Sequence, residues 1–187
     1  MQNNSIRNRD LIISKMNFIF QYHTPEGFGD LLMRSDGKVL TGLWFEGSTD
    51  GRKHPAEGIV QDLPLFDETR RWLDIYFSGR QPDFTPRYRI DYLTPFRREV
   101  QGLMCKIPFG QTATYGDIAA AIAAKHGVAK MSAQAVGGAV GWNPICIIIP
   151  CHRVIGADGN LTGYGGGLHN KMALLRLEGL GSGNWRS

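Results

Sequence analysis

The stretch Asn143–Val154, NPICIIIPCHRV, decides how the second half of this chain folds. Its large aliphatic residues, Ile145 and Ile147–Ile149, lie between two prolines, a pattern that predicts a buried extended segment. The apolar run stops at the second proline, so the segment delivers Cys151 and His152 at its end. A cysteine beside a histidine in that place is a candidate nucleophile.

The residues ahead of this stretch are typical of two short helices joined by a turn. Thr114 and Asp117 have the spacing of a capping box, which opens a helix over 114–124. Ser132 can cap the next helix, which completes a pattern that fits a helix-turn-helix. Its inward residues are expected to be Ala133, Val136, Gly137 and Val140. Small outer residues such as Gly138 permit close approach, either of a neighbouring helix or of another molecule.

The first half of the chain combines short strands with one helix. Residues 18–45 have the pattern of strands, with a hairpin connection at Ser35–Lys38. Residues 47–64 have the composition of a loop, and apolar residues recur at helical spacing over 66–77. A proline-rich extended connection over 81–95 then separates the two halves.

The second half begins with a predicted helix over 96–107 and ends with one over 168–178, which Gly179 terminates. The loop before that last helix, 156–167, contains six glycines. We therefore expect an α/β (α+β) protein, with a mostly helical second domain that contains the helix-turn-helix. The expected parts are a flexible extension over 1–15, a small α/β domain over 16–93 and the helical domain over 94–187.

Composition narrows the class of protein. The 187 residues are 42% hydrophobic and 20% charged, which is typical of globular proteins. No stretch approaches the roughly 20 apolar residues of a membrane span, so we expect a cytoplasmic location. Three cysteines without a CxxC pair indicate reduced thiols. Residues 94–187 hold 9 Lys and Arg against 4 Asp and Glu, which suits a polyanionic partner or a basic solvated surface.

A nucleophilic Cys151 needs a base, because an ordinary thiol with a pKa near ~8.5 is mostly protonated at neutral pH. His152 can take the proton, directly or through water, and a carboxylate on its other ring nitrogen would hold its tautomer. Glu178 is a candidate for that carboxylate, since it lies where the helix dipole disfavours a negative charge. From its position alone, a surface glutamate paired with Arg176 or Lys171 is the simpler interpretation.

The remaining cysteines and histidines lack such a pattern. Cys105 and Cys146 lie within an apolar helix or strand with no adjacent histidine, and we expect both to be inert. The histidines without a partner pattern are interpreted as surface or structural residues: His23, His54, His126 and His169.

The segment Pro150–Val154, preceded by Asn143 and Pro144, resembles the signature of the O6-alkylguanine-DNA alkyltransferase family. The resemblance extends in order over nearly all of 94–187. It includes Thr94–Phe96, Ile107–Gly110, Thr114–Gly116, Ala135–Ala139, Leu161–Gly167 and Lys171–Gly179. The first half resembles the family more loosely, in size and strand content, and the family would make it a ribonuclease H-like domain.

The resemblance implies a chemistry and a role for each matching residue. The alkyl group of O6-alkylguanine in DNA, or of O4-alkylthymine, would pass irreversibly to Cys151, once per molecule. His152 would act as the base through a bound water, and Glu178 would orient it. Asn143 would brace the turn before the cysteine, and Tyr115 would contact the DNA phosphate and protonate the leaving guanine.

The resemblance also implies a partner, double-stranded DNA, entered through the minor groove with the target nucleotide flipped out. The protein would act as a monomer without a cofactor. Some relatives carry a structural zinc in the first half, but residues 1–93 contain no cysteine, so no metal is expected. The substrate- and DNA-contacting residues would be Gln134, Ala135, Gly138, Arg153, Val154, Tyr164, Gly165 and Gly166.

One position departs from the family pattern. The residue before Ala135-Val136-Gly137 is usually an arginine that fills the gap left by the flipped base, and here it is Gln134. Glutamine can hydrogen-bond the orphaned cytosine but lacks the charge and planar fork of arginine. Weaker DNA binding and a slower flip are expected.

Three other functions are compatible with parts of the pattern. A non-catalytic lesion-binding protein would share the DNA-binding helices, but such proteins replace the acceptor cysteine, which is present here. A Cys-His hydrolase would need an oxyanion hole and no DNA-binding helices. An activator switched by self-alkylation would need a second DNA-binding domain or zinc-ligating cysteines, for which the sequence offers no support.

Overall fold

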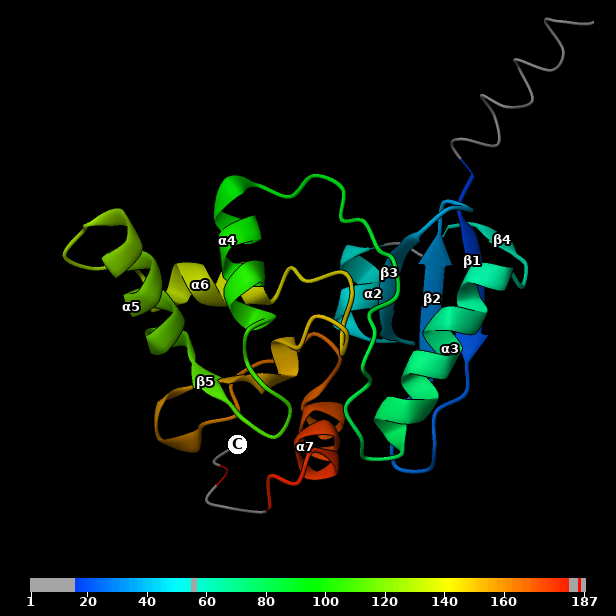
Figure 1. Ribbon diagram of the computed structural model, residues 1–187. Helices are drawn as coiled ribbons and strands as arrows, with labels where there is room; N and C mark the ends of the chain where they lie inside the picture. The colour runs from blue at the N-terminus through cyan, green and yellow to red at the C-terminus, as the bar shows by residue number, and fades with distance from the viewer. Residues whose placement is uncertain (1–15, 55–56, 182–184, 186–187) are drawn as a thin grey trace, which may run out of the picture.

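The structure, a computed structural model, describes residues 16–54, 57–181 and 185 and shows a mixed α/β chain (Figure 1). The extension expected over 1–15 lies outside the described residues. In Figure 1 the sheet lies at the right, and the helices of the second half gather at the left and below.

A four-stranded sheet in the order β3-β2-β1-β4 forms the first half. Strands β1 (Phe18–Tyr22), β2 (Leu31–Ser35) and β3 (Leu40–Phe45) are antiparallel neighbours, and β4 (Ile59–Val60) pairs in parallel with β1. The predicted hairpin connects β2 to β3, and its Asp36 carboxylate accepts from the Lys38 and Val39 amides at 2.9 and 3.0 Å.

Helix α3 (Pro64–Phe77) packs on this sheet because its apolar residues recur at helical spacing. Phe66 and Phe77 stack on Phe20 and Tyr22 of β1, with ring centroids 6.2 and 6.0 Å apart. The prediction of this helix is confirmed, and Ser78 and Gly79 follow its last turn as expected.

The loop predicted over 47–64 is more ordered than the sequence indicated. It contains β4 and the short helix α2 (Thr49–Lys53), which Ser48 caps by accepting from the Gly51 amide at 3.3 Å. The mixture of glycine and charge hid this helix, because only tertiary contacts stabilise five residues as a helix.

The second half contains four helices within the residues described: α4 (Pro95–Met104), α5 (Tyr115–His126), α6 (Ala133–Val140) and α7 (Leu168–Leu177). The capping box of Thr114 and Asp117 is present, and Ser132 caps α6. The two predicted helices α5 and α6 are therefore confirmed as a packed pair. Ala133, expected inward, is exposed because it lies in the first turn of α6.

The segment Asn143–Val154 is buried as predicted, but it is not a strand. It makes one isolated bridge between Ile145 and Leu43, and Ile147 takes a left-handed φ of 65°. The chain then forms the 3-10 turn η1 (Cys151–Arg153) before the two-residue strand β6 (Val154–Ile155), which pairs with β5 (Ala113–Thr114). Side-chain hydrogen bonds from Asn143 replace the ladder that a strand would need.

A continuous hydrophobic core joins the two halves, from Leu31 in β2 to Leu174 in α7. Two main-chain hydrogen bonds of Leu43 connect the two halves at this junction. Its amide donates to Pro144 O at 2.9 Å, and its carbonyl accepts from Cys146 N at 2.8 Å. Strand β3 therefore holds the segment that leads to Cys151. Among the described residues, no helix combines the length and apolarity needed to cross a bilayer.

Replacing Leu43 by alanine is expected to reduce the free energy of unfolding by about 2–5 kcal/mol, because its fully buried side chain leaves a cavity at this junction. Denaturant unfolding measures the loss. Val60→Ala is the matched control, since Val60 is 77% exposed and its truncation should cost less than about 0.5 kcal/mol. Equal losses for the two variants would contradict the assigned junction.

Candidate active site

A cleft of about 830 Å³ opens between α2, α5, α6 and the glycine-rich loop over 156–165. Its lining includes Tyr115, Gln134, Tyr164 and Gly165. Cys151 does not line the cleft itself: it is 5% exposed and lies within electrostatic reach of the Tyr115 and Tyr164 hydroxyls. The thiol therefore lies behind the cleft lining, where bulk water scarcely reaches it.

Asn143 holds the thiol of Cys151 and the turn that carries it. Its amide nitrogen lies 3.0 Å from Cys151 Sγ and donates to the carbonyls of Ile145 and Ile149 at 3.1 and 2.9 Å. Burial raises the pKa of Cys151 to about 11, although the Asn143 hydrogen bond and the charge of Lys171 oppose that rise. The resting group at neutral pH is therefore the thiol.

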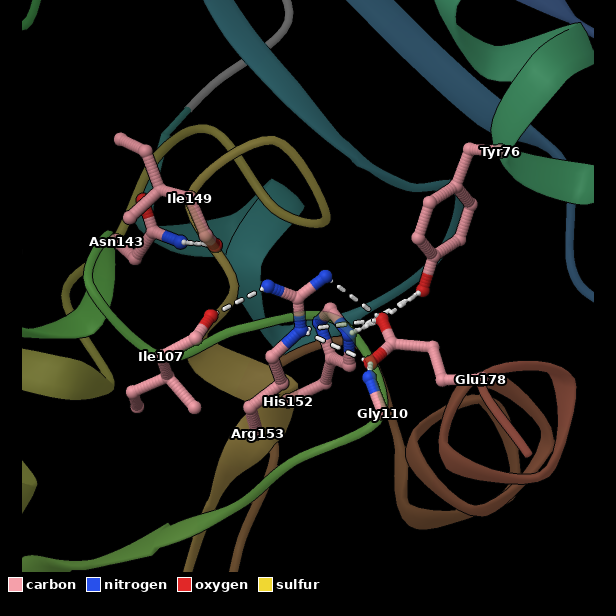
Figure 2. Close-up of polar contacts among 8 residues, drawn as sticks. All are labelled: Tyr76, Ile107, Gly110, Asn143, Ile149, His152, Arg153 and Glu178. Atoms are coloured by element: carbon pink, nitrogen blue, oxygen red, sulfur yellow. Dashed lines mark hydrogen bonds and ion pairs between the residues drawn. The ribbon is translucent and has the colours of Figure 1, made fainter. Parts of the chain in front are cut away.

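His152 and Glu178 come together as the sequence suggested (Figure 2). Both side chains are buried, and His152 Nε2 lies 2.7 Å from Glu178 Oε1. Burial lowers the pKa of His152, although Glu178 opposes that change, so the imidazole is neutral at pH 7. The other nitrogen, Nδ1, is buried and hydrogen-bonds no described group. With Nε2 donating to Glu178, Nδ1 is left with a lone pair for accepting a proton.

The Glu178 carboxylate accepts hydrogen bonds from four different residues (Figure 2). Besides His152, these are the Arg153 guanidinium at 2.9 Å, the Gly110 amide at 3.0 Å and the Tyr76 hydroxyl at 2.7 Å. Burial alone would raise the pKa of Glu178, but its hydrogen bonds with His152 and Arg153 and the charge of Arg153 hold it at about 2. The carboxylate is thus ionised at neutral pH, and the surface-glutamate interpretation is wrong.

The expectation that Arg153 contacts DNA needs correction. Its side chain is 9% exposed, donates to Glu178 and to the Ile107 carbonyl at 2.7 Å, and lies over the Phe109 ring. A guanidinium committed to a buried carboxylate and carbonyl is unavailable to a phosphate outside. Arg153 is instead the main counter-charge of Glu178.

Among the other expected contact residues, Gln134, Tyr164 and Gly165 line the cleft, and the cleft lining does not include Ala135, Gly138, Val154 and Gly166. Gln134, Ala135 and Gly138 are exposed on α6, and the ring of Tyr115 packs beside Gly137. Gly165 has a steric requirement, because a Cβ there would lie 1.7 Å from Asp50 Oδ1. Val154 is fully buried, and its carbonyl accepts from the Lys171 ammonium at 2.7 Å.

The structure adds three buried residues that the sequence interpretation did not include. Lys171 shares a helix face with Leu174, Leu175 and Glu178, a spacing that the sequence displayed, and burial lowers its pKa to about 8. Tyr76 occupies one of the apolar-spaced core positions of α3, and this pattern gives no sign of a role for its hydroxyl. Asp50 had no signal, since it fell within a predicted loop.

Cys146 also has a different setting from the expected one. It lies buried in the irregular segment before Cys151, and burial raises the pKa of its thiol well above the usual value. Cys105 lies at the exposed C-cap of α4 rather than inside the helix. Within the described ranges, no group of three or more His, Cys, Asp or Glu side chains forms a metal-binding cluster.

Comparison with known proteins gives consistent matches. Residues 95–180 match the family described as 6-O-methylguanine DNA methyltransferase, DNA binding domain. A methylated-DNA–protein-cysteine methyltransferase from Haemophilus influenzae is 37% identical over 163 residues, which cover 87% of this chain and 88% of that protein. A protein of the same name from Methanosarcina barkeri is 41% identical over 150 residues, with coverages of 80% and 90%.

A solved structure of a similar protein has the same fold. The crystal structure of Mycobacterium tuberculosis OGT in complex with DNA superposes with a TM-score of 0.72 at 38% identity, covering 86% of this chain and 92% of that one.

Replacing Glu178 by glutamine is expected to lower stability by about 3–5 kcal/mol at pH 7, because Arg153 loses its buried counter-charge. The folded pKa, about 2, lies below the ordinary value of 4.5, so this stabilisation is present above pH 4.5 and is lost as the pH falls toward 2. Denaturant unfolding at several pH values should show the two proteins converging in acid. Surface Glu26→Gln should show little change, and a pH-independent difference for Glu178→Gln would contradict the assignment.

Proposed function

The chain belongs to the methylated-DNA–protein-cysteine methyltransferase family, and from this premise we propose that it repairs DNA by moving the alkyl group of O6-alkylguanine onto Cys151. The observation that carries this proposal is the buried series Cys151, His152 and Glu178 beside a cleft on the helix-turn-helix. It joins a nucleophile, a neutral base and an ionised carboxylate in one place.

The acceptor is activated when substrate is in place. With a pKa of about 11, roughly one Cys151 in ten thousand is a thiolate at pH 7. His152 Nδ1 takes the thiol proton, through a water as the family pattern implies, and Glu178 stabilises the resulting imidazolium. Burial also protects this single-use acceptor from other electrophiles, because it keeps Cys151 as the thiol and the thiolate is the reactive form.

The transfer itself is a displacement at carbon. The sulfur electron pair of Cys151 forms a bond to the alkyl carbon while the bond from that carbon to guanine O6 breaks, and its electron pair stays on guanine. Tyr115, whose pKa burial raises, supplies a proton to the leaving base. The proton that His152 took from the thiol then returns through solvent to the Tyr115 oxygen. The balance is therefore one thiol proton exchanged for one alkyl group, and no cofactor enters it. The same displacement applies to O4-alkylthymine.

The partner that fits the cleft is double-stranded DNA with the damaged nucleotide flipped out. Helix α6 presents Gln134, Ala135 and Gly138 on an exposed face narrow enough for the minor groove, with Gly138 open on its outer side. The loop at Tyr164–Gly166 would cover the base, and the carbonyls of Cys151 and Val154 would accept from its exocyclic amine. The protein would act as a monomer.

A non-catalytic lesion-binding protein is the alternative. It would use the same cleft. It would have no need of the buried relay, the series formed by Cys151, His152 and Glu178, because desolvated charges are costly to assemble. The presence of both the thiol and its base favours transfer.

Incubation with an oligonucleotide that carries O6-methylguanine should add the mass of one methyl group, in place of one hydrogen, to the intact protein. Peptide mapping should place it on Cys151, and Cys151→Ala should abolish it. Cys105→Ala is the matched control and should react fully, because Cys105 lies at the exposed C-cap of α4 and not in the buried series. An unchanged mass together with tight lesion binding would support the alternative.

The substitution Gln134→Arg is expected to accelerate methyl transfer from duplex DNA several-fold, since arginine adds charge and a planar fork beside the flipped base. Transfer from free O6-methylguanine base should be unaffected, because no flipping is required there. Single-turnover rates with the two substrates measure the contrast. Equal duplex rates for the two proteins would count against this role of position 134.

A further inference from the structure

Tyr76 connects the first half of the chain to the candidate relay (Figure 2). It belongs to α3, its side chain is fully buried, and its hydroxyl lies 2.7 Å from Glu178 Oε1 and 3.2 Å from His152 Nε2. His152 and Glu178 lie 76 and 102 residues further along the chain. A hydroxyl that touches both members of an acid–base pair is placed to control their proton.

We propose that Tyr76 is a positioning residue of the transfer reaction, which holds the proton of His152 on Nε2 and leaves Nδ1 free to accept the thiol proton. This inference rests on the proposed function for its kinetic consequence, but its structural consequence can be measured separately. Tyr76 does not contact the reacting atoms and acts through Glu178 and His152.

The direction of the hydrogen bonds follows from the charges. Burial, followed by the negative charge of Glu178, raises the pKa of Tyr76 well above its usual value, so the hydroxyl keeps its proton. Glu178 is ionised and can only accept, and Tyr76 therefore donates to it. The Tyr76 oxygen then presents lone pairs toward His152 Nε2. With two acceptors, Oε1 and the phenolic oxygen, beside it, Nε2 must carry the hydrogen.

Packing holds the hydroxyl in this position. The Tyr76 ring stacks on Trp72 with centroids 5.4 Å apart, and it meets the edges of Phe77 and Phe109 at 5.6 and 5.9 Å. Such contacts restrict the ring to one rotamer. Through Tyr76, the first half of the chain therefore acts on the proposed reaction, although Tyr76 does not line the cleft.

The effect of removing the hydroxyl has a definite sign. The charged groups that act on His152 are Glu178 and Lys171 from α7 and Arg153 from η1, and Tyr76 adds a neutral donor from α3. Without that donor the carboxylate charge is less satisfied, so it attracts the proton of the imidazolium more strongly. The pKa of His152 should rise, and the transfer rate should fall earlier as the pH decreases.

The test compares Tyr76→Phe with Tyr22→Phe in the full chain. Tyr22 of β1 is the matched control. Its hydroxyl donates at 2.8 Å to Asp74 of α3, the helix that also carries Tyr76, and lies away from the relay. Single-turnover methyl transfer from O6-methylguanine duplex is measured against pH. In Tyr76→Phe the acidic limb should move upward by about one pH unit, while Tyr22→Phe should follow the wild type. A Tyr76→Phe limb that coincides with both would overturn the proposal.

A second measurement does not depend on transfer. The nitrogen-15 chemical shifts of the His152 ring report which nitrogen carries hydrogen, and their titration gives its pKa. The wild type should show hydrogen on Nε2 only, and Tyr76→Phe should show a raised pKa or a mixture of tautomers. Identical spectra and titrations would overturn the positioning role. If the wild type transfers no methyl group yet these spectra differ, the proposed function fails and the positioning of His152 stands.

Discussion

The buried carboxylate of Glu178 is the interaction on which the rest of the site depends. It accepts from Tyr76 of α3, from Gly110 of the segment before α5, and from His152 and Arg153 of η1. Three separate parts of the chain therefore converge on the one negative charge that Glu178 carries at the end of α7. Burying it is favourable only while every partner is in place, so the fold and the ionised relay form together.

Burial also sets the protonation state of Cys151, the proposed acceptor. Low solvent exposure raises the pKa of Cys151 and lowers that of His152, so both are neutral at rest. A thiol kept in this form is protected, and a charge separation is needed before it reacts. Glu178 and Asn143 supply the fixed hydrogen bonds that stabilise the two charges once they form. In the proposed reaction, which uses Cys151 once, protection of the thiol matters as much as its reactivity.

The first half of the chain does more than complete the core. Strand β3 bonds the segment that delivers the nucleophile, α3 contributes Tyr76, and α2 places Asp50 against Gly165 in the glycine-rich loop. The negative charge of Asp50 also acts to raise the pKa of Cys151. A fragment made of the helix-turn-helix and the cysteine segment would lack all three contributions.

Local patterns in the sequence determined the helices other than α2, the caps of α5 and α6, and the pair of Cys151 and His152, because capping, periodicity and neighbouring residues act over a few positions. The motif and its order along the chain also brought Glu178 to the relay. Only the tertiary structure decided that Arg153 faces inward, that Tyr76 and Asp50 belong to the site, and that Asn143–Val154 is a braced turn rather than a strand. The reason is physical: these roles come from hydrogen bonds and burial between residues far apart in the chain, which no local pattern specifies.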